Sequence, residues 1–275
     1  MSSAAPASSS SGIARIHAAF AKARVQKRCA LLPFLTGGFP DLVTTRRLLR
    51  ELPEAGADLV EIGFPFSDPI ADGPVIAESM HRALQAGVTP DVVFELIESA
   101  APTIPVLAMV SMSIVQRRGI ERFVRQAVGA GVAGFIVPDA DPQTAQELSE
   151  LALSSGAGYC ALVAPTTSPS RVATQAKLST GFVYLLTRAG VTGETGEAPE
   201  IASRVALVRA STSNPIAAGF GISTREQVRA VGAHADGAIV GSAIVRAMTQ
   251  AMNDGSASSS AADAALACVR ALTAR

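Results

Sequence analysis

The sequence predicts a single (β/α)8 TIM barrel with an extra helix before the first strand and extra helices after the second and eighth strands. Eight short apolar runs recur along the 275 residues, and a helical pattern follows each one. The runs are continuous rather than alternating, as expected of parallel strands covered on both faces. A doubly wound open sheet is the competing fold, but it needs fewer strands, and no GxGxxG turn follows the first run.

The chain starts with the Ser-rich segment MSSAAPASSSSG, which we expect to be a disordered tail over residues 1–12. An amphipathic helix over Ile13–Lys27 then runs directly into the first strand, so residues 13–275 are expected to form one barrel domain. The tail lacks the apolar stretch of a secretory signal. The first acidic residue of the chain is Asp41, and an amino-terminal segment without acidic residues leaves an organelle transit peptide as a less favoured alternative.

Strands and helices are expected to alternate along the rest of the chain. The expected strands are Ala30–Leu35, Leu59–Ile62, Pro105–Val110, Phe135–Val137, Tyr159–Val163, Phe182–Leu186, Ile216–Ala218 and Ala238–Val240. The expected helices between and after them are Thr44–Ala55, Val75–Ala86, Pro90–Ala101, Ile120–Ala130, Pro142–Ser155, Arg171–Ser179, Ile201–Ser211, Arg225–Val231, Ala243–Met252 and Ala261–Leu272. Capping residues precede proline at Thr89 and Asp141, and glycine ends helices at Gly56, Gly87 and Gly131.

Composition excludes several classes of partner. Lys plus Arg and Asp plus Glu both total 23, Trp is absent and there are only two Tyr, so neither a basic field nor stacking platforms favour nucleic acid. No apolar run approaches the roughly 20 residues of a membrane span. The three cysteines are scattered without CxxC spacing, which predicts reduced thiols and a cytoplasmic protein.

Elimination leaves carboxylates as the candidate catalytic groups. None of the three lysines lies at a strand end, which disfavours a Schiff base or lysine-bound pyridoxal phosphate (PLP). The three histidines lack metal-ligand spacing, so no metal site is expected. No GxSxG elbow occurs, and no cysteine has a neighbouring histidine.

Glu61 is the first candidate, because it lies inside the second strand near its carboxyl end. It faces either the barrel interior or the helix layer, and in both places desolvation raises the pKa of a carboxyl group, which suits proton transfer near neutral pH. A structural Glu paired with a buried Arg is the equally weighted alternative. Asp72 follows on the loop above the same strand, and Asp68 precedes a proline there; both also fit ordinary turns.

Glycine-rich turns follow the sixth, seventh and eighth strands. Gly219-Phe220-Gly221-Ile222-Ser223 follows the seventh, and Gly241-Ser242-Ala243 follows the eighth and opens a helix. Barrels often bind phosphate between these two loops, so we favour a phosphate site over simple tight turns. The loop Gly190–Gly193 is flexible enough to close over a ligand.

The run Val60–Pro74, VEIGFPFSDPIADGP, closely resembles the signature of the tryptophan synthase α subunit family. The likeness continues in order through most of the chain. It covers Pro33–Thr36, Pro138-Asp139, Val163–Ser168, Gly190–Gly193, Gly219–Ser223 and Gly241–Val245.

The resemblance implies a lyase that cleaves indole-3-glycerol phosphate to indole and glyceraldehyde 3-phosphate without metal or Schiff base. By the same match, Glu61 is the acid–base residue, and Asp72 hydrogen-bonds the indole N–H. The remaining implied substrate-binding residues form two groups, one around the phosphate and one around the indole and glycerol. The phosphate group is Gly193, Gly221, Gly241 and Ser242, and the indole and glycerol group is Phe34, Met109, Tyr184, Phe220 and Ile239. Thr192 is a further substrate-binding residue by the same match.

The resemblance also implies a PLP-dependent β subunit as partner in an αββα heterotetramer. The cofactor belongs to that partner, so this chain is expected to carry none. Asp68 and Pro69 match the β-contacting loop. Departures from the family pattern bear on β contact more than on catalysis; they are Phe39, Ser111, Met112, Ser113 and Asp141. A stand-alone lyase that releases free indole and an idle barrel that only activates β are the alternatives.

Overall fold

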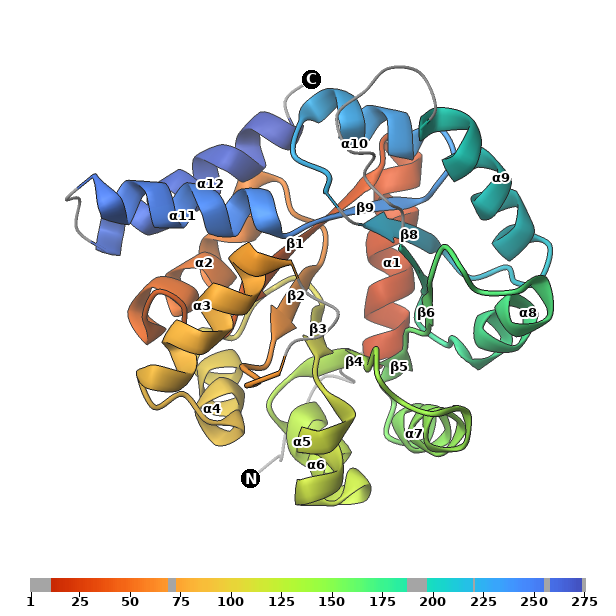
Figure 1. The fold of residues 1–275 in the computed structure, drawn as a ribbon, viewed down its shortest axis with the longest axis horizontal. Helices are drawn as coiled ribbons and strands as arrows, with labels where there is room; N and C mark the ends of the chain where they lie inside the picture. The colour runs from red at the N-terminus through yellow and green to blue at the C-terminus, as the bar shows by residue number, and fades with distance from the viewer. Residues whose placement is uncertain (1–10, 69–72, 187–196, 220, 255–257, 274–275) are drawn as a thin grey trace, which may run out of the picture.

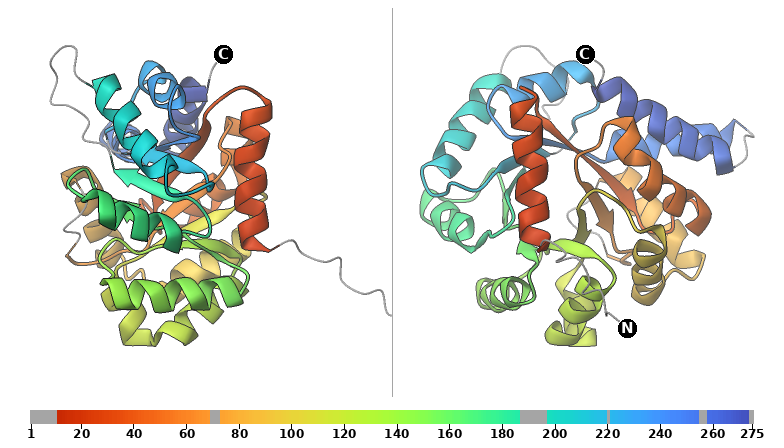
Figure 2. Two further views of the ribbon diagram at one scale, coloured as in Figure 1. Left: turned by 90° about the vertical axis from the view of Figure 1, so that its right-hand side faces the viewer. Right: turned by 180° about the vertical axis from the view of Figure 1, so that it is seen from behind.

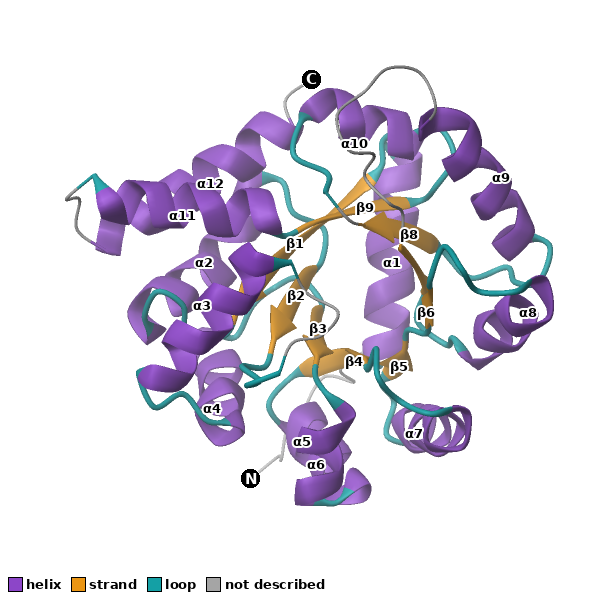
Figure 3. Cartoon of the chain, in the orientation of Figure 1, coloured by secondary structure: helices purple, strands orange, loops and turns teal. Residues whose placement is uncertain are grey.

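The computed structural model describes residues 11–68, 73–186, 197–219, 221–254 and 258–273. Parallel strands form a sheet that curls on itself, with helices around its outside (Figures 1 and 3). The strands are β1 (Ala30–Thr36), β2 (Val60–Gly63), β3 (Val106–Met109), β4 (Val132–Ile136), β5 (Gly158–Tyr159), β6 (Leu162–Val163), β7 (Val183–Leu186), β8 (Ile216–Gly219) and β9 (Gly237–Val240). Their order is β5-β4-β3-β2-β1-β9-β8-β7-β6.

The two edge strands, β5 and β6, are halves of one interrupted strand. Between them the Cys160 N–H donates to the Phe135 carbonyl of β4 at 2.8 Å, and the Tyr184 N–H of β7 donates to the Ala161 carbonyl at 3.0 Å. This segment therefore hydrogen-bonds to both of its neighbours and joins the two ends of the sheet. The eight predicted strands and the barrel are confirmed, with the fifth strand divided in two.

The helices match the predicted ones within a few residues, with one addition. They are α1 (Gly12–Val25), α2 (Leu42–Ala55), α3 (Pro74–Gln85), α4 (Pro90–Ala100), α5 (Met112–Arg118), α6 (Ile120–Gly129), α7 (Pro142–Ser154), α8 (Pro169–Leu178), α9 (Glu197–Arg209), α10 (Arg225–Gly232), α11 (Ser242–Asn253) and α12 (Ser258–Thr273). The helix α5 was not predicted, because two turns are too short to show a helical period. Ser111 caps its start and Gly119, at φ 83°, ends it.

The strand residues pack into two separate cores, and in β2 the two cores alternate along the chain. In β2, Val60 and Ile62 belong to the outer core between sheet and helices. Leu59, just before the strand, belongs to the inner core that fills the barrel. This period of two places Glu61 on the inner face as well.

The helix α1 closes the amino-terminal end of the barrel, as the view from behind shows (Figure 2). Ile16 is fully buried there, and its Cδ1 lies 3.0, 3.1 and 3.4 Å from where a Cβ would stand on Gly134, Gly158 and Gly181. The ring of His17 hydrogen-bonds the Gly181 carbonyl at 2.9 Å. In the described part of the chain, α1 thus fills this end of the barrel interior and leaves the carboxyl-terminal end as the side from which a ligand can enter.

We expect Ile16→Ala to lower the free energy of unfolding by about 2–5 kcal/mol, because the three glycines cannot fill the space that the side chain leaves. Urea unfolding followed by circular dichroism measures this change. The steady-state rate of the folded variant should stay within about twofold, since Ile16 lies at the far end of the barrel. If the free energy of unfolding falls by less than about 1 kcal/mol, the packing at the amino-terminal end of the barrel does not depend on Ile16.

Candidate active site

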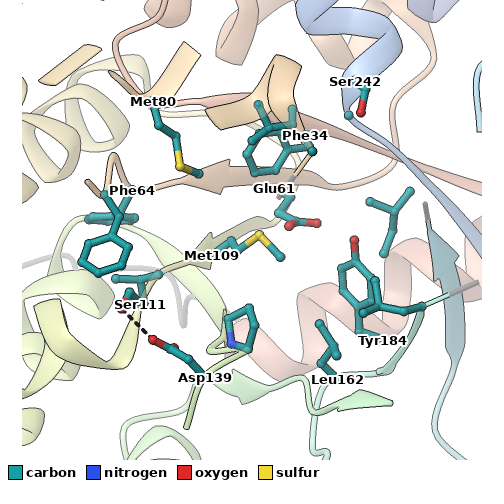
Figure 4. Close-up of a pocket in the computed structure, with 18 of the residues that line it drawn as sticks. Phe34, Glu61, Phe64, Met80, Met109, Ser111, Asp139, Leu162, Tyr184 and Ser242 are labelled. Atoms are coloured by element: carbon teal, nitrogen blue, oxygen red, sulfur yellow. Dashed lines mark hydrogen bonds between the residues drawn. The ribbon is translucent and has the colours of Figure 1, made fainter. Parts of the chain in front are cut away.

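A cavity of about 470 Å³ opens at the carboxyl-terminal ends of the strands. Strand ends and the loops that follow them supply most of its lining, and α3 supplies one wall (Figure 4). Active sites of barrel enzymes lie at this end. The lining residues are Phe34, Glu61, Phe64, Phe66, Asp68, Gly73, Ile76, Met80, Met109, Val110, Ser111, Ser113, Pro138, Asp139, Leu162, Tyr184, Leu186, Gly221, Ile239, Gly241 and Ser242.

Glu61 lies in the middle of this cavity and is fully buried. It sits in β2 in register with Phe34 of β1 and Leu107 of β3, so two strands fix its backbone. Its side chain points into the barrel rather than toward the helix layer, which decides the orientation that the sequence left open. The carboxyl group of Glu61 can therefore contact a ligand that occupies the cavity.

All of the predicted substrate-binding residues that the structure describes line the cavity together with Glu61. Phe34, Met109, Tyr184 and Ile239 form apolar walls from four different strands (Figure 4). Gly221, Gly241, Ser242 and Asp68 also line the cavity. Pro69, Asp72, Thr192, Gly193 and Phe220 lie outside the described residues, so nothing is added here to what the sequence implies for them.

Several lining residues were missed by the sequence analysis. Ile76 and Met80 lie one turn apart on α3, and this spacing, beside the loop that carries the candidate aspartates, was the available signal. Leu162 begins β6 and Leu186 ends β7, and neither has a distinguishing pattern in the sequence. Phe64 packs edge-on against Phe94 at 5.2 Å and so links the cavity wall to α4.

Carboxylates are the only side chains among the described lining residues that carry a charge at neutral pH when ionised as usual. Glu61, Asp68 and Asp139 line the cavity, and no Lys, Arg or His does so in this part of the chain. Among the described lining residues, the groups that can donate to an anionic ligand are backbone N–H groups and hydroxyls. Ser242 begins α11, where the N–H groups of Ile244 and Val245 bond to the Gly241 carbonyl and the earlier ones point out of the helix.

Thiol chemistry does not fit the barrel interior. Cys160 is fully buried, and burial raises the pKa of its thiol to about 12, with a smaller upward contribution from the Glu61 carboxyl. A thiol in this state is not a nucleophile near neutral pH. Among the described residues, no cluster of His, Cys, Asp or Glu is suited to hold a metal ion.

Asp139, at the mouth of the cavity, stabilises the start of α5. It accepts hydrogen bonds from the Ser111 hydroxyl at 2.6 Å and from the Met112 N–H at 2.8 Å, and so holds the first turn of α5 (Figure 4). Ser113 hydrogen-bonds Ser111 at 2.9 Å. The three residues that depart from the family pattern here therefore form one connected network with Asp139.

The other two departures also have local reasons. Phe39 is buried, and the Arg82 guanidinium lies over its ring at 5.3 Å, so the side chain packs against α3. Asp141 is exposed and caps α7 by accepting from the N–H groups of Gln143 at 3.0 Å and Thr144 at 3.2 Å.

A second, open cavity of about 1180 Å³ lies at the opposite end of the barrel and is lined by basic side chains. Arg24, Arg229 and Arg270 are in the last turns of α1, α10 and α12. Cations are favoured at helix carboxyl ends, where an anion is repelled. The helix dipoles thus favour these three charges.

Known proteins resemble this chain over nearly its whole length. The family profile described as "Tryptophan synthase alpha chain" matches residues 20–272. The chain belongs to the tryptophan synthase alpha chain family. The alpha chain of Prochlorococcus marinus (strain MIT 9313) is 45% identical over 242 residues, which are 86% of this chain and 88% of the relative. That of Synechococcus elongatus is 45% identical over 235 residues, 84% of this chain and 88% of the relative.

Solved structures show the same family and fold. Tryptophan synthase subunit alpha from Legionella pneumophila superposes with a TM-score of 0.84 at 31% identity, covering 94% of this chain and 96% of that one. A tryptophan synthase chain from Mycobacterium tuberculosis gives a TM-score of 0.80 at 32% identity, covering 93% of this chain and 98% of the other. The expected family, barrel fold and enzyme class are confirmed. The family generally works without a cofactor of its own.

Proposed function

We propose that this chain cleaves indole-3-glycerol phosphate with Glu61 and Asp72 as its catalytic residues and delivers the indole to a β subunit for tryptophan synthesis. The reaction follows from membership of the alpha chain family, which is the lyase subunit that cleaves indole-3-glycerol phosphate. The observation that carries the assignment of residues is a fully buried Glu61 in the middle of a cavity at the carboxyl end of the barrel. The alternatives of a stand-alone lyase and an idle barrel are not favoured by the comparisons.

The reaction transfers a proton and breaks one carbon–carbon bond. Indole C3 gains a proton, the hydroxyl on the adjacent glycerol carbon loses one, and the bond between them breaks to give indole and an aldehyde. Glu61 takes the hydroxyl proton and supplies the C3 proton, and the Asp72 carboxylate accepts a hydrogen bond from the indole N–H while positive charge develops on the ring. The apolar walls exclude water from the charged intermediate.

Backbone N–H groups at Gly221, Gly241 and Ser242, together with Gly193, are proposed to hold the phosphate. Gly221 lines the cavity and adopts φ 71°, a backbone conformation that favours glycine. The start of α11 adds a favourable helix dipole. This arrangement suits a cavity whose described walls carry carboxylates and no cation.

We expect Ser242→Asp to raise KM for the substrate at least tenfold, because the new carboxylate meets the phosphate at the helix start. The same charge stabilises the first turn of α11 by about 0.3–1 kcal/mol, so the thermal stability of the variant should not decrease. Steady-state kinetics and thermal unfolding measure the two effects. Ser242→Asn is the matched neutral control, and an equal KM for the two variants would place the phosphate elsewhere.

The proposed partner is a PLP-dependent β subunit in an αββα heterotetramer, with Asp68 and Pro69 at the contact. Asp68 is exposed at the cavity mouth, where a partner and the leaving indole both have access. A cytoplasmic location is proposed from the biosynthetic role of the family. None of the described helices has the length and apolar run needed to cross a bilayer.

Indole release from indole-3-glycerol phosphate by the purified chain, with and without β subunit, tests this function. Slow release that rises strongly with β supports the coupled subunit. Fast release indifferent to β supports the stand-alone lyase. No release under either condition supports the idle barrel and refutes the catalytic assignment.

A further inference from the structure

Two buried hydroxyl groups join β1 to α3 behind the cavity wall. The Oγ1 of Thr36 and the Oγ of Ser79 are 2.6 Å apart, and the side chains are 0% and 1% exposed. The Ser79 hydroxyl donates to the Ile76 carbonyl at 2.7 Å. Since a hydroxyl has one hydrogen to donate, Thr36 supplies the hydrogen of the bond to Ser79.

The position of this pair connects it to the wall residues on both elements. Thr36 is the last residue of β1 and follows Phe34 by two positions, so both side chains lie on the same face of the strand. Ser79 is next to Met80 on α3 and three residues after Ile76. Phe34, Ile76 and Met80 line the cavity, whereas Thr36 and Ser79 do not.

The end of β2 is shaped to receive this wall. A Cβ on Gly63 would lie 2.5 Å from the Phe34 Cζ and 3.2 Å from the Met80 Cε, so both side chains occupy space that only glycine leaves. Gly63 pairs with Thr36 in the sheet and is two residues from Glu61. The placement of α3 against β1 therefore sets the width of the cavity beside Glu61 (Figure 4).

We propose that Thr36 and Ser79 are positioning residues that hold the α3 wall at the distance required for an indole ring beside Glu61. This inference rests on the proposed function for the identity of the ligand. The hydrogen bond between Thr36 and Ser79 fixes the apolar wall that α3 supplies. The proposed phosphate-binding residues Gly241 and Ser242 belong to other elements. The pair should thus control affinity for indole and leave affinity for phosphate unchanged.

The test compares Thr36→Val, which keeps the shape but loses the hydroxyl, with Thr36→Ser, which keeps the hydroxyl. We expect Thr36→Val and Ser79→Ala each to weaken indole binding and to lower kcat/KM about tenfold, because small displacements of positioning groups are costly. Thr36→Ser should stay within about threefold of wild type. Affinity for inorganic phosphate, measured by calorimetry, should not change in any of them.

The double variant should lose no more than Ser79→Ala alone, since that change already breaks the bond to Thr36. Ser149→Ala is the matched control, because Ser149 is a buried serine whose hydroxyl bonds the Leu178 carbonyl at 2.8 Å far from the cavity. The proposal is overturned if indole affinity is unchanged, if indole and phosphate affinities fall together, or if Ser149→Ala gives the same loss. Indole binding is measured without turnover, so a wild-type chain that fails to cleave substrate would refute the proposed function separately.

Discussion

Replacing Glu61 by Gln should abolish indole release while leaving ligand binding within a few-fold of wild type. The amide keeps the shape of the side chain but neither accepts the hydroxyl proton nor supplies one to indole C3. A positioned acid–base group alone contributes about 10²–10⁴-fold to a rate, and here one residue serves both transfers. Steady-state release of indole and calorimetric titration with indole measure the two halves of the prediction.

Asp139→Asn is the control for Glu61→Gln, because Asp139 is another carboxyl group that lines the same cavity. Both of its oxygens are engaged by Ser111 and Met112, and an amide can keep contact with each. Its loss of rate should therefore stay below about tenfold. Substantial turnover by Glu61→Gln, or equal losses in the two variants, would contradict the assignment of Glu61 as the proton-transfer residue.

The barrel was predictable because its physical signals are strong and local. Strands covered on both faces must be continuous apolar runs, so each of the eight expected strands has its counterpart in the structure. Helix ends carried their own capping residues, as at Thr89 and Asp141. The interruption at Cys160 was not predictable, since two neighbouring strands that pair with different halves of one run leave no mark in its composition.

The site was predictable to a lesser degree. A charged residue inside an apolar run is rare enough to single out Glu61, but periodicity alone did not decide between the barrel interior and the helix layer. The register with Leu107 and the inner-core position of Leu59 decide it. The substrate-lining side chains were named from resemblance, and the cavity brings the described ones together.

Contacts between elements distant in sequence were beyond prediction. The residues 111–113 read as departures from a pattern, whereas the structure joins them to Asp139, 26 or more residues later, as the cap of α5. Thr36 and Ser79 are ordinary residues of a strand and a helix. Only the packing of α3 across the end of β1 gives them a shared role.

Replacing Asp72 by Asn should reduce indole release about 10²-fold or more, both with and without a β subunit. Asn keeps an oxygen for the indole N–H but loses the negative charge that offsets the positive charge on the ring. Removal of one preorganised electrostatic contact typically costs 10²–10³ in kcat. KM should change little, because the substrate before protonation carries no ring charge. Initial rates of indole release at saturating substrate measure the effect.

Asp68→Asn separates catalysis from coupling, because Asp68 belongs to the same loop and also loses one negative charge. We expect its release of indole without β to stay near wild type, since it lies at the exposed mouth of the cavity and Glu61 lies in the middle. Its stimulation by β should fall, because the proposed contact loses a charge. Asp72→Asn should instead lose rate in both conditions. If the two variants behave alike, the loop acts as one charged unit, and the separate roles proposed for Asp68 and Asp72 are wrong.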